Sequence, residues 1–377
     1  MAKRAIPRAR GRRLLLGVAV VLALLVIAGR IQQVVLAPHR PAPAPAPSTT
    51  IPRALPVTAT IELGIPPASP SAEAQLVVGE GRLWALLNGT LVAVDPQRTS
   101  TVARIRLGRP GGFVRLLAVG AGAVWVVTES GVVRVDRATA KVTGTLPNGS
   151  MLWAGAAAGV GSLWLVRCAS EEGPCALLRL DPRRLHTTAR FPLPGLTAAL
   201  PAASLAVSND SAWLLDRSGR WLWRVDLASG RVARLRLPAA DFGVVPGQLA
   251  IGEGAVWVLT NVDSPTRLGS RVDMGLVRID PHTNRVAATT PLANLDSDPY
   301  HTGLVVGAGG VWVEGQQRQQ DGLAHAVIDR VDPASGRLRG AIETGDPSPT
   351  ALAAGLGALW LLRSAAGVLL RLDPAAM

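Results

Sequence analysis

The chain has 377 residues, 48% of them hydrophobic, so it is long enough to bury a large core. Its formal net charge of +13 suggests nucleic-acid binding, but residues 1–53 hold nine of the 39 basic residues and no acidic ones. The remaining residues carry 30 basic and 26 acidic side chains. This near balance argues against a basic nucleic-acid-binding face, and we expect no nucleic-acid partner.

The N-terminus combines a basic flank with an apolar segment. Residues 1–13 form a basic tail, and residues 14–37 are mostly apolar, with Arg30 as the one charged residue. If Arg30 snorkels, a helix over this segment is long enough to cross a bilayer. A cleaved export signal is the alternative, with Val26-Ile27-Ala28 as a passable cleavage sequence.

The basic flank favours a cytoplasmic N-terminus. The sequence thus predicts a single-pass protein of the cell membrane whose remaining chain is extracytoplasmic. Residues 38–56 are rich in Pro and Ala and include the run PAPAPAP, which predicts a stiff, extended linker.

A repeat occupies the rest of the chain. Each copy contains G-x-G, two further residues, Trp, a hydrophobic run, and later an apolar residue followed by Asp; the fourth copy has Ser-Asn-Asp in place of G-x-G. The seven repeat tryptophans are spaced by 39 to 55 residues: Trp84, Trp125, Trp164, Trp213, Trp257, Trp312 and Trp360. This period is typical of propeller blades. Seven copies predict an all-β, seven-bladed β-propeller over residues 57–377, with four-stranded antiparallel blades.

One repeat shows how the four strands arise. Apolar or alternating runs at 117–120, 123–128, 132–135 and 141–146 predict strands. The turn Gly120-Ala121-Gly122 supplies the positive φ angles of a tight hairpin. Asp at the third-to-fourth turn can bond to its own backbone.

The chain ends predict how the ring closes. The last repeat stops at Leu372-Asp373-Pro374 and lacks its fourth strand. Residues 57–64 match the fourth-strand pattern of the first repeat, residues 102–108. We therefore expect the N-terminal strand to complete the C-terminal blade, which leaves no open sheet edge.

The repeat tryptophans and glycines have a structural interpretation. Each Trp lies in the middle of a strand that packs on the next blade, so we expect buried core residues and not a ligand-stacking ring. G-x-G joins two strands here, whereas a phosphate-binding motif would open a helix, so no nucleotide site is predicted.

The two faces of the predicted ring differ. First-to-second and third-to-fourth turns are short and uniform, and we call their side the plain face. The opposite side, the variable face, carries the second-to-third hairpins and the links between blades, with insertions at 167–174, 261–274 and 315–324. Long loops on one face of a rigid scaffold favour recognition there.

Blades five and six provide the candidate binding residues on that face. The predicted binding group is Tyr300, Arg318, Asp321, Arg267 and Asp273, with Asp263 and Arg271 beside it. An ordinary solvated loop surface is the alternative. His186 and His282 lie in turns and should be solvated. Cys168 and Cys175, the two cysteines of the chain, are expected to form a disulfide outside the cell.

Three segments carry a resemblance to known propellers. "VGEGRLW" (78–84), "IGEGAVWVLTN" (251–261) and "VRIDPHTNRVAATTPL" (277–292) resemble the YVTN/YncE-type and streptogramin B lyase-like propeller repeats of bacteria. The lyase branch implies a metal-dependent enzyme that opens a cyclic peptide lactone. That resemblance would make His301, His325 and Glu314 the base and metal group, with a divalent metal such as Mg²⁺.

Two functional hypotheses follow. The first is a non-catalytic, membrane-tethered, extracytoplasmic scaffold that binds a protein, peptide or cell-wall ligand, acts as a monomer and needs no cofactor or metal. The second is the lyase-like enzyme. A quinone- or haem-dependent role is disfavoured because the sequence has no C-x-x-C-H motif.

Overall fold

The computed structural model describes residues 56–66, 74–107, 114–128, 130–147, 152–170, 173–197, 202–216, 219–238, 248–262, 273–292, 295, 303–318, 324–344 and 350–376. The chain divides into two compact units, Met1–Thr49 and Thr50–Met377. The predicted basic tail, transmembrane segment and linker lie outside the described residues, except for Pro56. In the described part, no helix is long and apolar enough to cross a membrane.

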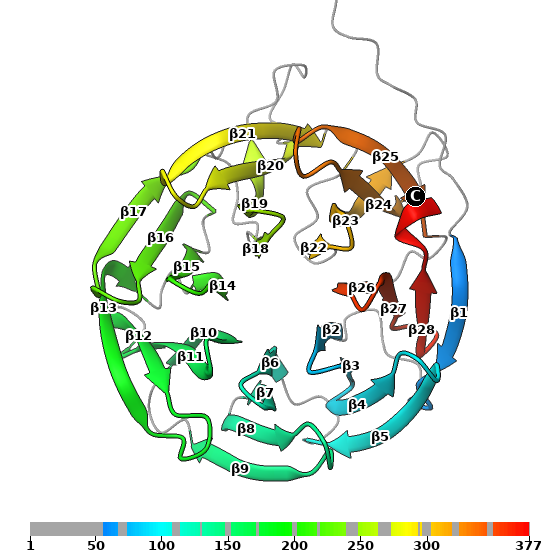
Figure 1. Cartoon of the computed structure of the whole chain (residues 1–377), viewed down its shortest axis with the longest axis horizontal. Helices are drawn as coiled ribbons and strands as arrows, with labels where there is room; N and C mark the ends of the chain where they lie inside the picture. The colour runs from blue at the N-terminus through cyan, green and yellow to red at the C-terminus, as the bar shows by residue number, and fades with distance from the viewer. Residues whose placement is uncertain are drawn as a thin grey trace, which may run out of the picture. The chain divides into compact units, whose positions relative to one another are not determined.

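Each blade has four strands, which in blades one to six follow the sequence order from the centre of the ring to its rim; in blade seven the outermost strand is the N-terminal one (Figure 1). The innermost, first strands are β2 (Ala74–Gly79), β6 (Val114–Gly120), β10 (Leu152–Gly159), β14 (Ala202–Val207), β18 (Gln248–Gly252), β22 (Gly303–Gly307) and β26 (Thr350–Gly355). The second strands are β3 (Arg82–Leu87), β7 (Ala123–Thr128), β11 (Ser162–Cys168), β15 (Ser211–Asp216), β19 (Ala255–Val262), β23 (Gly310–Arg318) and β27 (Ala358–Arg363).

The third strands are β4 (Thr90–Asp95), β8 (Gly131–Asp136), β12 (Pro174–Leu180), β16 (Trp221–Asp226), β20 (Asp273–Asp280), β24 (Ala324–Val331) and β28 (Val368–Leu372). The fourth strands are β5 (Ser100–Arg106), β9 (Val142–Pro147), β13 (Thr187–Thr197), β17 (Val232–Arg236), β21 (Arg285–Leu292), β25 (Leu338–Glu343) and, for blade seven, β1 (Val57–Glu62). A short 3₁₀ turn, η1 (Pro374–Ala376), ends the described chain.

These strands form seven antiparallel four-stranded sheets within the described residues, so the predicted seven-bladed propeller is confirmed. Innermost strands of successive blades contact one another, and β2 of blade one contacts β26 of blade seven. The four strands predicted for blade two are all present, with the first and third longer than expected.

The N-terminal strand closes the ring as predicted. β1 pairs antiparallel with β28, and Val57 lies opposite Leu372. The backbone N–H of Asp373 donates to the carbonyl oxygen of Pro56 at 3.1 Å. Blade seven therefore joins the two ends of the propeller, and its edge is covered.

The core lies between the blades. Among the described residues, seven apolar clusters occur, one at each interface between neighbouring blades. All seven repeat tryptophans are at most 1% exposed. A Trp that buries ~200 Å² contributes on the order of 5 kcal/mol at ~25 cal/mol/Å², so packing explains their recurrence.

The two glycines of G-x-G have different roles. A Cβ on the first one, Gly79, would lie 2.6 Å from Cγ1 of Val119 in blade two, so this glycine allows close approach of the next blade. The second, Gly81, has a φ of 77°, and the residue between them, Glu80, also takes a positive φ of 54°. The prediction assigned the positive φ angles to the glycines, whereas the central residue of the turn shares them.

Candidate functional site

The predicted blade-five and blade-six site falls mostly outside the described residues. Tyr300, His301, Arg267 and Asp321 lie outside the described residues, as do Asp263 and Arg271. For Asp273, Arg318 and His325 the structure gives backbone positions: they begin β20, end β23 and lie second in β24. The binding group and the metal group built from these residues stay predictions. Within the described residues, no cluster of three His, Cys, Asp or Glu could hold a metal ion.

Glu314 is the one member of the predicted metal group whose side chain is described. It lies in β23 opposite Ile328 and is 4% exposed. Gly303 of β22 lies beside it, and a Cβ there would come within 3.0 Å of the Glu314 Oε2 atom. Burial raises the pKa of Glu314 to about 8, because desolvation disfavours the carboxylate. At neutral pH this side chain is mainly a protonated acid and not a carboxylate base.

A second buried acid, Asp329 of β24, was not identified from the sequence. It is fully buried, and neither carboxyl oxygen has a hydrogen-bond partner within the part of the chain that the structure describes. Its strand neighbours on the same face, Val327 and Val331, pack against blade five. Desolvation raises the pKa of Asp329 to about 7.

Both acids replace apolar residues of the repeat. The strand registers align Glu314 with apolar residues in the other six blades: Leu86, Val127, Val166, Leu215, Leu259 and Leu362. They align Asp329 with Val92, Val133, Leu178, Trp223, Val277 and Leu370. Glu314 lies on the blade face with Trp312, toward blade seven, and Asp329 lies on the opposite face of the same sheet. The two acids therefore do not form one site.

Blade three contains a cavity of about 260 Å³. Its described lining comes from the second, third and fourth strands of the blade and the adjoining hairpin: Arg167, Cys168, Ala169, Pro174, Ala176, Leu178, Thr187 and Arg190. Ala176 and Leu178 give an apolar wall, whereas Arg167 and Arg190 are the charged members. None of the described lining residues is acidic.

The disulfide fixes one end of this cavity. Cys168 and Cys175 are joined and lie directly opposite each other in β11 and β12, with their Cα atoms 4.0 Å apart. The bond closes the hairpin of the blade-three insertion on the variable face. It holds Arg167, the neighbour of Cys168, next to Ala176 on the facing strand.

The neighbouring blade carries an exposed aromatic and cationic feature. The guanidinium of Arg234 lies 3.5 Å from the ring centroid of Trp221 and 5.1 Å from that of Trp223. Arg234 is exposed and Trp221 is partly buried. Tryptophan and arginine are the residue types most enriched in binding hot spots, and stacking pre-orients the guanidinium. Ala176 and Leu178 of the cavity pack toward blade two, whereas Trp223 packs against the opposite face of blade three, so the cavity and this stack lie on opposite faces of the blade-three sheet. We call the two features together the blade three–four site.

The other arginines near the tryptophans have a structural role. In six blades an Arg of the third strand lies over the repeat Trp, with guanidinium-to-centroid distances of 5.2 to 5.9 Å. In blade one, Ala93 takes this place opposite Trp84. An Arg two residues before the turn Asp is the sequence signal for this pair.

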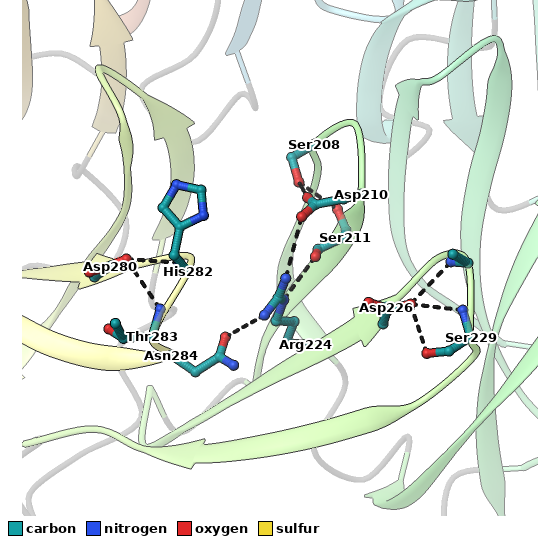
Figure 2. Close-up of polar contacts among 11 residues, drawn as sticks. Ser208, Asp210, Ser211, Arg224, Asp226, Ser229, Asp280, His282, Thr283 and Asn284 are labelled. Atoms are coloured by element: carbon teal, nitrogen blue, oxygen red, sulfur yellow. Dashed lines mark hydrogen bonds and ion pairs between the residues drawn. The ribbon is translucent and has the colours of Figure 1, made fainter.

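Polar contacts on the plain face join blades. Figure 2 shows Arg224 of blade four, which donates to Ser211 Oγ at 2.8 Å and to Asn284 Oδ1 of blade five at 2.9 Å. Its guanidinium also forms a 3.4 Å ion pair with Asp210. Asp226 accepts from the backbone and hydroxyl of Ser229 at 2.7 Å, as predicted for a turn Asp. The Arg224–Asn284 hydrogen bond links blades four and five, whereas the bonds of Asp226 stay within its own turn.

The two turn histidines do not contribute to a described site. His186 and His282 are both exposed, in agreement with the sequence prediction. In Figure 2 the His282 ring points away from Asp280, whose carboxylate accepts from the His282 backbone N–H at 2.8 Å.

Comparison with solved structures identifies the fold. The Pan2 WD40 domain of Neurospora crassa matches with a TM-score of 0.60 and 10% sequence identity, covering 86% of this chain and 98% of that one. The Cps50 (Swd1) β-propeller domain of Myceliophteria thermophila matches with a TM-score of 0.59 and 12% identity, covering 84% and 99%. No family model and no curated protein sequence matches the chain. At these identities the likeness shows a β-propeller, and the resemblance to YVTN/YncE-type and lyase-like repeats stays a prediction.

Proposed function

We propose that this protein is a non-catalytic binding scaffold, tethered to the membrane and extracytoplasmic, that recognises a protein or peptide ligand through the blade three–four site. The observation that carries the proposal is the cavity lined by Arg167 and Arg190. Two guanidinium groups beside an apolar wall suit a carboxylate next to an aliphatic group, as found at an acidic side chain or a peptide C-terminus.

The rigid ring supports this role. Binding costs less when the contact residues are already ordered, and the disulfide and the stacked Arg234 fix two parts of the site. The predicted blade-five and blade-six surface on the same variable face would extend the contact area.

Membrane tethering is part of the proposal and depends on residues 14–37 of the sequence. The full chain should remain in the membrane fraction after alkaline extraction, and a chain lacking residues 14–37 should not. Release of the full chain by alkali would contradict the tether.

Site-specific photo-crosslinking in cells tests the binding. A photoreactive amino acid is placed in the full chain at Thr187, an exposed residue of the cavity lining, or, as a control, at Arg106, an exposed fourth-strand residue of blade one. We expect a defined adduct at position 187, absent at position 106 and lost when Arg190 is changed to Gln. Equal adducts at both positions, or none at 187, would contradict the proposed site.

A further inference from the structure

The described chain begins at the plain face. β1 starts at Val57, opposite Leu372, the last residue of β28. Leu372 is followed by the residues that form the third-to-fourth turn in the other blades, and these turns lie on the plain face. Thr58 Oγ1 donates to the carbonyl oxygen of Arg371 at 3.2 Å, which fixes the start of β1 there. The chain that precedes residue 56 therefore joins the propeller at the plain-face end of its rim.

Cations dominate the most exposed positions of this face. Among the described plain-face turn residues and those next to them, the exposed basic ones are Arg98, Arg137, Lys141, Arg183, Arg184, Arg231, Arg285 and Arg337. The exposed acidic ones are Asp210 and Glu253, and Asp210 is paired with Arg224. Two of the exposed cations are also paired, Arg137 with Glu80 at 3.1 Å and Arg98 with Asp95 at 3.9 Å, so the excess of positive charge comes from the remaining six.

The aspartates of the third-to-fourth turns are less exposed than these cations. Each is partly buried and accepts hydrogen bonds from its own turn; Asp181, for example, accepts from the backbone N–H groups of Arg183 and Arg184 at 2.9 and 2.7 Å. These bonds lower the pKa of Asp181, so the carboxylate stays ionised but tied to the turn. Long Arg and Lys side chains extend beyond it, which makes the outer layer of the face positive.

From these observations we propose that the plain face docks on an anionic lipid surface, with the variable face turned away from the membrane. This inference rests on the tether of the proposed function. Residues 38–56 span at most about 60 Å when extended, which keeps the ring near the bilayer without forcing contact. Each cation close to anionic lipid strengthens association about fivefold, so a few arginines suffice to keep a tethered domain bound to the lipid surface.

Docking also gives the fold a functional orientation. The blade-three hairpin closed by the disulfide lies on the variable face, opposite the side where the linker joins. With the plain face on the lipid, this hairpin points toward partners outside the membrane.

Lipid quenching of a fluorophore measures the orientation in the full chain. The protein is reconstituted into phosphatidylcholine vesicles with or without about 30% phosphatidylglycerol, both containing a headgroup spin label. A fluorophore is attached to cysteine in Ala138→Cys, on the plain face, or in the matched variant Ala366→Cys, in a variable-face hairpin. Both alanines are exposed, and the native cysteines are in a disulfide. We expect at least twofold stronger quenching at position 138 than at 366 with phosphatidylglycerol, and none of this excess in pure phosphatidylcholine.

Two charge-matched variants separate docking from general attraction. Arg183→Gln with Arg184→Gln should reduce the excess quenching at position 138 several-fold. Arg106→Gln with Arg236→Gln, near the other end of the blades, should leave it unchanged. Equal quenching at both probe positions, or excess quenching that is the same without anionic lipid, would overturn the docking proposal. Loss of the protein from floated vesicles would instead refute the tether, and competition by a soluble polyanion with no lipid effect would reassign the face to a polymer partner.

Discussion

Replacing Asp329 by Val should make the propeller more stable, and increasingly so as the pH rises. Asp329 is fully buried with no hydrogen-bond partner among the described residues, and the six other blades have an apolar residue at its position. Burial raises its pKa from 3.8 to about 7. Because the folded-state pKa is raised, the unfolded state gives up its proton first, and the free energy of unfolding falls between about pH 4 and pH 7.

The magnitude follows from the shift. A difference of about three pKa units corresponds to about 4 kcal/mol, which is the largest loss that ionisation of Asp329 can cause. Glu314, with a pKa raised from 4.5 to about 8, adds a loss of similar size between about pH 4.5 and pH 8. Near pH 4 the Asp329→Val variant should gain on the order of 1 kcal/mol from apolar burial, and near pH 8 it should gain several.

The free energy of unfolding is measured by urea unfolding, followed by tryptophan fluorescence, at half-unit steps between about pH 4 and 8.5. Asp329→Asn is the matched control, since it keeps the shape and polarity but cannot ionise. In both variants the free energy of unfolding should fall less as the pH rises, because one buried ionising group is missing. At low pH only the Val variant should be more stable than the wild type. Parallel pH profiles for the wild type and the Asn variant would refute the reasoning, because Asp329 would then ionise at no cost.

Three further changes test the fold. Gly79→Ala should destabilise the ring by about 1–3 kcal/mol in urea unfolding, since its Cβ would lie 2.6 Å from a valine side chain of blade two, whereas Gly340→Ala, with open space around it, should change little. Replacing Cys168 and Cys175 by Ala should lower the free energy of unfolding by about 2.5 kcal/mol, from the entropy of the loop that the disulfide closes, and so lower the urea midpoint. An unchanged midpoint would mean that the hairpin is ordered without its disulfide. Deleting residues 57–62 should expose the edge of blade seven and produce concentration-dependent association in light scattering; a deletion variant that stays monomeric would argue against closure by this strand.

The fold could be predicted from the sequence because the repeat is tied to backbone geometry. Glycines in tight hairpins and a Trp at one fixed distance recur in nearly every copy, and strand pairing follows from them. Closure by residues 57–62 was predictable for the same reason, since a fourth-strand pattern was missing at one end of the chain and present at the other.

The candidate sites were harder to predict because they consist of departures from the repeat. The cavity of blade three depends on how three strands and a hairpin pack, and no local motif marks Arg190 as its lining residue. Asp329 lies inside an apparently regular third strand, so its burial is visible from sequence only after the seven third strands are aligned. The lyase-like resemblance implies a role for Glu314 in a metal group, but its burial, which keeps it protonated, could be seen only in the structure.

Hydrogen exchange of the full chain, alone and with the ligand recovered from the position-187 adduct, tests the central claim most directly. The account predicts that binding slows amide exchange in β11, β12 and β13 of blade three and in β16 and β17 of blade four, with little change in the plain-face turns. Protection confined to β20, β23 and β24 would contradict it, and would place recognition on blades five and six instead.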